Sequence, residues 1–354
     1  MAKVFLYDEF SPEDVAMMQA LYSRSPESVE KHVEKVKQTG SGNFMEKFYV
    51  GYGHASIADC GSTTIFIEDI SILVDKAIQD SRLYSGQETS TRYIDMSKRR
   101  IVDPIGSSKS RDILHRWMDF YTSSQEKMRE ELVKNYPMTS KDNESSYNRA
   151  IAARAFDILR GFLPAGITTQ LSWHTNLRQA YDKLSLLRYH PLEEARQTAR
   201  RIHRKLQEKY PHSFAHLPND DQEQYRSLVG ENFSYFSPPK RVPIFSCKST
   251  LNTSLLTPYK KLLSSRPPKT SLPVFLGDAG TLSFSFLLDY GSFRDIQRHR
   301  SGICRMPLLT TKLGFHLWYL SQLSKELRVL AEKLLHRQVR YIADLSCDHT
   351  VRQY

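Results

Sequence analysis

Residues 79–93 read Q-D-S-R-L-Y-S-G-Q-E-T-S-T-R-Y, and they place charged and hydroxyl side chains around one glycine. Gly86 among small hydroxyl residues predicts a turn or an irregular loop. The guanidinium groups of Arg82 and Arg92 can bind a phosphate, and the carboxylate of Glu88 can accept a ring N–H or a sugar hydroxyl. The stretch therefore indicates a site for an anionic ligand. A solvated surface loop is the alternative that composition alone favours.

The length and composition are those of a globular chain. A chain of 354 residues predicts one large domain or two smaller ones. Its residues are 40% hydrophobic and 25% charged, and no apolar run approaches the roughly 20 residues that cross a bilayer. The start, M-A-K-V-F-L-Y-D-E-F, carries acidic residues too early for a secretory signal, so a cytoplasmic location is expected.

Cysteine spacing and charge narrow the class of ligand. The cysteines form no C-x-x-C pair, so reduced thiols and no metal site are expected for Cys60, Cys247, Cys304 and Cys347. The formal net charge of +11 suits binding of phosphorylated small molecules or of nucleic acid. Because the basic residues are dispersed and form no long basic arm, we expect a small phosphorylated ligand, with nucleic-acid binding as the weaker alternative.

Capping signals and hydrophobic periodicity outline helices around a β-rich stretch. Ser11-Pro12 and Ser25-Pro26 each resemble a helix start, because a serine N-cap precedes a proline in the first turn. Residues 63–66 are β-rich, and residues 70–78 predict a buried helix or strand. Further helices are expected over residues 111–132, 151–159, 193–209 and 317–343.

One spacing within the opening stretch is shared with a known family. The pattern S-x-x-E-x-S-x-R-Y is formed by Ser85, Glu88, Ser90, Arg92 and Tyr93. It resembles the second half of the signature of the flavin-dependent thymidylate synthases, also called thymidylate synthase complementing proteins. The first half of that signature is R-H-R, and Asp80-Ser81-Arg82 stands in its place here. A complete R-H-R occurs later, at residues 298–300.

Two further blocks carry the same resemblance. Residues 53–59 are similar to the family element G-H-x-[ST]-x-x-[ED], with a histidine, a serine and an aspartate at its fixed positions. Residues 160–178 match the family pattern R-x-x-L-P-x-x-x-x-T-x-x-x-W-x-x-N-x-R without a gap. Asp182 stands where the family is expected to have asparagine.

The resemblance implies a role for each matching residue. Those that would contact dUMP are Gln79, Glu88, Ser90, Arg92, Arg160 and Arg188. Those that would contact FAD are His54, Ser56, Asp59, Arg82, Asn176, Arg178, Arg298, His299 and Arg300. Arg92 and Arg160 would be catalytic, because they would bind and polarise the uracil or its phosphate. The arginines at positions 92, 160 and 178 are expected to converge on one cleft.

An offset of 218 residues suggests an internal repeat. It lays Thr281 on Thr63 and Arg300 on Arg82. We expect a thymidylate synthase-like domain over residues 1–217, a Pro/Ser/Lys-rich connection over 218–270 and a partial second copy over 271–354. The second copy keeps R-H-R, but the positions equivalent to Glu88, Ser90 and Arg92 hold Met306, Leu308 and Thr310. The fold implied by the resemblance is α+β, a mixed sheet with flanking helices.

The activity implied by the resemblance is the reductive methylation of dUMP to dTMP. FAD would be the cofactor, methylenetetrahydrofolate the carbon donor and NADPH the reductant. Family sites form between the subunits of a tetramer, so two tandem chains are expected to emulate that tetramer. The alternative is a catalytically degenerate homologue that binds nucleotide or flavin or has a structural role in an assembly, because Asp80 replaces a cation with an anion. A basic nucleic-acid-binding protein is a third and weaker interpretation.

Overall fold

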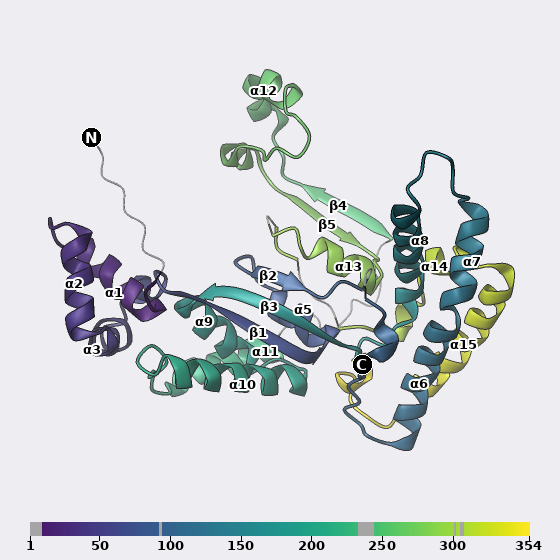
Figure 1. Ribbon diagram of the computed structural model, residues 1–354, viewed down its shortest axis with the longest axis horizontal. Helices are drawn as coiled ribbons and strands as arrows, with labels where there is room; N and C mark the ends of the chain where they lie inside the picture. The colour runs from purple at the N-terminus through teal and green to yellow at the C-terminus, as the bar shows by residue number, and fades with distance from the viewer. Residues whose placement is uncertain (1–8, 92–93, 233–243, 301, 305–307) are drawn as a thin grey trace. The chain divides into compact units, whose positions relative to one another are not determined.

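The structure is a computed structural model that describes residues 9–91, 94–232, 244–300, 302–304 and 308–354 (Figure 1). Contacts divide the chain into two compact units, one within residues 1–236 and 290–354 and the other within residues 237–289. These units follow internal contacts alone, so the predicted domain boundaries and the second copy over 271–354 stay predictions.

The sheet of the first unit has three antiparallel strands in the order β1-β3-β2. The strands are β1 (Ser62–Ser71), β2 (Ser85–Glu88) and β3 (Thr168–Asn176). The strand predicted over residues 63–66 is confirmed within β1. The turn predicted at Gly86 is wrong, because this residue lies inside β2 and pairs with the central strand β3.

Helices supply most of the first unit. They are α1 (Pro12–Tyr22), α2 (Val29–Thr39), α3 (Gly42–Phe44), α4 (Ala55–Ala58), α5 (Ile72–Gln79), α6 (Ser108–Ser123), α7 (Gln125–Asn135), α8 (Glu144–Leu159), α9 (Leu177–Leu187), α10 (Glu193–Lys209), α11 (Asp220–Glu231), α13 (Tyr290–Ile296), α14 (Leu317–Ser321) and α15 (Lys325–Ala343). With the three-stranded sheet they confirm the α+β class, and every strand pair in the described residues is antiparallel.

Side-chain caps explain where these helices begin. Ser11 caps α1, because its Oγ accepts a hydrogen bond from the amide of Asp14 at 3.2 Å, as the serine–proline signal predicts. The second signal is displaced, since Ser28 and not Ser25 precedes α2. The single helix predicted over residues 111–132 is divided at Ser124, where α6 ends and α7 begins.

Helix α5 lies in the larger hydrophobic core of the first unit. All eight of its residues are buried, including Asp75, Lys76 and Gln79. The core around it joins β1, β3, α9 and α10, and it includes Phe293 of α13. A second core joins α6, α7, α8 and α15, which lie together in Figure 1. Burial of a charge is unfavourable unless the charge is paired, so the buried polar residues of α5 are expected to have polar partners.

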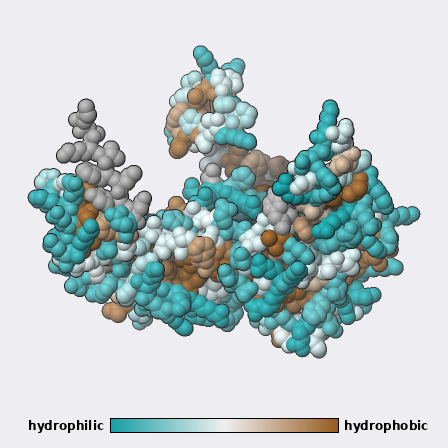
Figure 2. Space-filling model, viewed as in Figure 1, coloured by the Kyte–Doolittle hydropathy of each residue, from teal (hydrophilic) through white to brown (hydrophobic). Residues whose placement is uncertain are grey.

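The second unit is a small antiparallel strand pair with short helical turns. β4 (Phe245–Ser249) pairs with β5 (Leu282–Phe286), and α12 (Lys260–Ser264) lies in the connection between them. Its strands are mostly exposed, and hydrophobic side chains gather on the surface of this unit (Figure 2). At an offset of 218, β5 corresponds to residues within β1 and α13 to residues within α5, so a strand precedes a helix in both places.

Two observations on the described residues bear on membranes and metals. Within the described ranges, no helix has both the length and the apolar character needed to cross a bilayer. The His, Cys, Asp and Glu side chains in the same ranges form no group of three or more that is suited to hold a metal ion.

Candidate functional site

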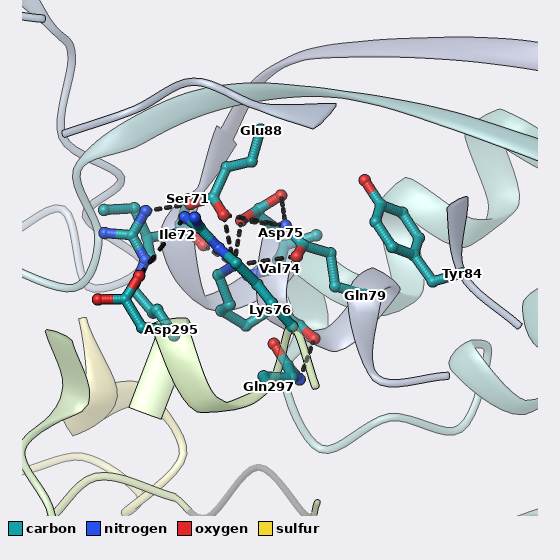
Figure 3. Close-up of polar contacts among 12 residues, drawn as sticks. Ser71, Ile72, Val74, Asp75, Lys76, Gln79, Tyr84, Glu88, Asp295 and Gln297 are labelled. Atoms are coloured by element: carbon teal, nitrogen blue, oxygen red, sulfur yellow. Dashed lines mark hydrogen bonds and ion pairs between the residues drawn. The ribbon is translucent and has the colours of Figure 1, made fainter. Parts of the chain in front are cut away.

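The polar side chains of α5 meet the last residue of β2, Glu88. Oε2 of Glu88 accepts hydrogen bonds from Nζ of Lys76 and, at 3.1 Å, from Nε2 of Gln79 (Figure 3). Oε1 of Gln79 accepts from Lys76 at 3.1 Å, and its Nε2 also donates to Asp75 at 2.9 Å. Lys76 and Gln79 share a face of the helix because they are three residues apart. Two residues predicted to contact the nucleotide, Gln79 and Glu88, therefore lie within hydrogen-bonding distance.

A second cation that contacts Glu88 comes from a segment distant in sequence. Arg294, in α13, forms an ion pair with Oε1 of Glu88. The exposed fractions of the Arg294, Lys76 and Glu88 side chains are 8%, 0% and 5%. Both carboxylate oxygens of Glu88 are thus bound by cations that are shielded from solvent.

Two carboxyl groups in this cluster have opposite protonation preferences. Burial raises the pKa of Glu88, but the charges of Arg294 and Lys76 outweigh burial and hold that pKa below its ordinary value. Burial, followed by the negative charge of Glu88, raises the pKa of Asp75 from 3.8 to about 7. The surroundings therefore separate the two pKa values and favour ionised Glu88 beside a more readily protonated Asp75.

Arg160, which follows α8, lies between two carboxylates. Its Nη1 is 3.3 Å from Oδ1 of Asp157, and its Nη2 is 3.3 Å from Oδ2 of Asp295. Asp295 follows Arg294 in α13, so one short helix contacts both Arg160 and Glu88. Among the described residues, buried Nε of Arg160 has no hydrogen-bond partner.

A separate ion pair joins two residues predicted to contact flavin. Nε of Arg178 donates to Oδ1 of Asp59 at 2.8 Å, and its Nη2 lies 2.7 Å from Oδ2 of the same carboxylate. Asn176 caps α9, because its Oδ1 accepts a hydrogen bond from the amide of Gln179 at 2.8 Å. His54 and Ser56, at the start of α4, are exposed.

The remaining arginine of the predicted dUMP set lies in a third group. Nη2 of Arg188 is 3.0 Å from Oε1 of Glu223, a carboxylate in α11 that also pairs with Arg226. The hydroxyl of Tyr189 donates to Oε2 of Glu223 at 2.7 Å. Arg188 is therefore joined to α11 and, among the described residues, shares no polar contact with Glu88 or Arg160.

The loop residues after β2 are described in part. Ser90 is partly buried and its carbonyl oxygen accepts a hydrogen bond from the amide of Ile94 at 3.2 Å. Arg92 and Tyr93, which carry the end of the predicted signature, lie outside the described residues.

The displaced R-H-R is exposed. Arg298, His299 and Arg300 are exposed, as is Arg82, and Arg298 lies 3.7 Å from Asp295. Burial and the charges of Asp75 and Glu88 raise the pKa of Tyr84, while the guanidinium of Arg300 opposes this shift. Arg300 therefore interacts electrostatically with Tyr84, which lies in the connection between α5 and β2.

The predicted residues do not all meet in one cleft of a single chain. Arg160 precedes β3 and Arg178 follows it, and a nine-residue strand spans about 27 Å. Within the described part of the chain, the two arginines have no ion-pair partner in common. The expected convergence of positions 160 and 178 is therefore not met within one chain, because an extended strand separates them.

Lys76, Asp75 and Arg294 were not predicted as part of the site. Helical spacing could have indicated Lys76, because it lies three residues before Gln79 on a buried helix. The offset of 218 could have indicated Arg294, because it places this residue at the position equivalent to Lys76.

Comparison with known proteins identifies the family. The family model described as thymidylate synthase complementing protein matches residues 6–212, which is more than half of the chain. The chain belongs to this family, as the motifs predict.

Curated relatives match over a longer region. A UPF0159 protein of Chlamydia pneumoniae is 24% identical, and UPF0159 proteins of Chlamydia muridarum and Thermoplasma acidophilum are each 23% identical. Each alignment covers 78% of this chain, which is more than residues 1–212 contain, so each extends beyond the family match. The chain spans 62% of the length of the two chlamydial relatives and 69% of the Thermoplasma relative.

Proposed function

We propose that this protein is a flavin-dependent thymidylate synthase that converts dUMP to dTMP. Gln79, Glu88 and Arg160 come from three segments of the chain, yet residues of one helix, α13, link Glu88 and Arg160. This arrangement is the observation that carries the proposal, because the family resemblance assigns all three residues to the same nucleotide. The carbon donor would be methylenetetrahydrofolate and the reductant NADPH.

Arg160 and Arg92 would bind the nucleotide and polarise its uracil ring. The side chain of Arg160 is partly exposed, so its guanidinium can donate to a carbonyl or phosphate oxygen of a ligand. A fixed guanidinium in a site shielded from water stabilises negative charge that develops on the ring. Ser90 and Arg188 would supply the remaining polar contacts to dUMP.

The residues predicted for FAD fit the charge of its diphosphate. Arg82 and Arg300 are exposed and have no carboxylate partner among the residues that the structure describes. Asp59, Arg178, Asn176, His54 and Ser56 would hold the flavin at the other end of β3. Bound reduced flavin would supply the hydride, while the residues of this chain would orient the reactants and exclude water.

Two chains are needed for a complete site in this proposal. Arg160 and Arg178 lie at opposite ends of β3. The end of β3 that carries Arg178 and would bind flavin in one chain would therefore face the end that carries Arg160 and would bind dUMP in the other chain. The predicted second copy would replace further subunits, so that two chains emulate the family tetramer. A monomer of this chain would then bind dUMP more weakly than the assembly of two chains.

A purified full-length chain tests the proposed reaction. We expect a flavin absorption band, and we expect conversion of dUMP to dTMP that requires both methylenetetrahydrofolate and NADPH. Replacing Arg160 with alanine should lower kcat/KM by about a hundredfold, because one charge-stabilising donor is lost. Arg154→Ala, an exposed arginine on α8 that donates to Tyr136 and Gln322, is the matched control and should leave the rate unchanged. Absence of flavin and of dTMP in the wild type would exclude this function.

Flavin occupancy tests the role of the displaced R-H-R. Arg298→Ala should lower the ratio of bound flavin to protein, because it removes a cation next to the flavin diphosphate. Fluorescence of flavin released by denaturation measures this ratio. An unchanged ratio would show that residues 298–300 do not bind the cofactor.

A non-catalytic homologue that binds nucleotide is the second candidate. Asp80 stands where a flavin-binding arginine is expected, and the nearby Nζ of Lys183 donates to the Asp80 carbonyl oxygen at 2.7 Å. An aspartate about 4 Å from a phosphate would weaken binding by roughly 4 kcal/mol at an effective dielectric constant near 20. Tight dUMP binding without flavin or turnover would favour this candidate.

A further inference from the structure

Helix α13 of the predicted second copy and the residue after it contact the three segments that carry Gln79, Glu88 and Arg160. The hydroxyl of Tyr290 donates to the carbonyl oxygen of Ile72 at 3.2 Å, where α5 begins. Nε2 of Gln297, directly after α13, donates to the carbonyl oxygen of Lys76 at 3.1 Å (Figure 3). These two neutral hydrogen bonds fix α13 against α5. They place the two charged residues between them, Arg294 and Asp295, beside the site.

Arg294 and Lys76 occupy equivalent positions of the predicted repeat. The offset of 218 superimposes them, and each binds a different oxygen of the same carboxylate, that of Glu88. A buried ion pair requires good geometry to offset the loss of hydration, so both cations restrict the position of Glu88. The second copy therefore supplies half of the charge that holds this residue.

Glu88 is the last residue of β2, and the predicted Ser90 and Arg92 lie two and four residues after it. Both oxygens of its carboxylate are engaged by the protein itself, so Glu88 anchors the chain even without a ligand. We propose that Arg294 is a positioning residue that fixes Glu88 and thereby the start of the nucleotide-binding segment. The role for nucleotide rests on the proposed function, whereas the anchoring of residues 85–91 does not.

Hydrogen exchange without ligand tests the anchoring. In the full-length protein, Arg294→Met should raise amide exchange in residues 85–91 by about tenfold, because the end of β2 opens more often. Arg294→Lys, which keeps a cation, should restore most of the protection. Asp295→Asn removes a charge from the same helix without touching Glu88, and it should leave exchange in this segment unchanged.

A double-mutant cycle on dUMP affinity tests how Arg294 acts. We expect Arg294→Met to weaken binding by about tenfold in the wild-type background and by much less in a Glu88→Gln background. A residue that contributes only general stability would give the same loss in both backgrounds. The double variant also avoids an unpaired buried charge, so it remains measurable if Arg294→Met alone unfolds.

The two measurements separate the possible failures. Faster exchange and a coupled loss of affinity would support the positioning role. Faster exchange in a wild type that binds no dUMP would retain the anchor and overturn the proposed function. Unchanged exchange in Arg294→Met, or equal losses of affinity in both backgrounds, would overturn the inference while leaving the proposed function intact.

Discussion

Replacing Glu88 with alanine is expected to lower the free energy of unfolding by about 3 kcal/mol, because it leaves buried cations without their partner. The loss should lie at the lower end of the range for broken buried pairs. Asp75 remains 3.4 Å from Nζ of Lys76, and its pKa falls once the charge of Glu88 is gone. Its ionised form can then offset one of the two cations.

The pH dependence of this loss follows from the raised pKa of Asp75. A carboxyl group whose pKa rises from 3.8 to about 7 on folding binds more protons in the folded protein. The contribution of Asp75 to the wild-type unfolding free energy therefore falls as pH increases through that window. The fall should be shallower in Glu88→Ala, so the difference between the proteins should be larger at about pH 5 than at about pH 8.

Urea denaturation of both proteins at the two pH values measures these differences. Glu193→Ala is the matched control, because Glu193 also pairs with two arginines, Arg196 and Arg200, but its side chain is 51% exposed. Exposed pairs of this kind contribute at most about 1 kcal/mol. If Glu88→Ala destabilises no more than Glu193→Ala, the buried cluster contributes no net stability.

Local signals in the sequence predicted the helices better than the contacts of the site. The Ser11 cap and the helix over residues 193–209 were predicted correctly, because capping and apolar spacing act over a few residues. The start of α2 was displaced by three residues, since Ser25 and Ser28 both satisfy the capping rule. Such errors change a boundary and leave the element in place.

The contacts of Glu88 show why the rest of the site escaped prediction. Gln79 is nine residues from Glu88, and both were predicted to contact the same nucleotide, whereas Arg294 is 206 residues from Glu88. Equivalence of Arg294 and Lys76 in a repeat does not imply that both bind the same group. Arg160 and Arg178 show the converse, because they are near in sequence and yet are separated by an extended strand.

Replacing Gly86 with alanine is expected to displace β2 from β3. A Cβ at this position would lie 1.9 Å from the carbonyl oxygen of Ser172 and 2.5 Å from the hydroxyl of Tyr84. The carbonyl belongs to the central strand and cannot move without disturbing its pairing, so β2 must shift instead. We expect a loss of about 2–3 kcal/mol in the free energy of unfolding, as for an overpacked core.

The same substitution should weaken dUMP binding by more than tenfold, because Glu88 lies two residues further along β2 and would leave Lys76 and Arg294. Calorimetric titration with dUMP and urea denaturation measure the two effects. Gly277→Ala is the control, since a Cβ there meets no atom within 4 Å, and it should change stability by no more than about 0.5 kcal/mol. Gly86 is then required for space beside the neighbouring strand and not for a turn. A Gly86→Ala variant with wild-type stability and affinity would contradict this explanation.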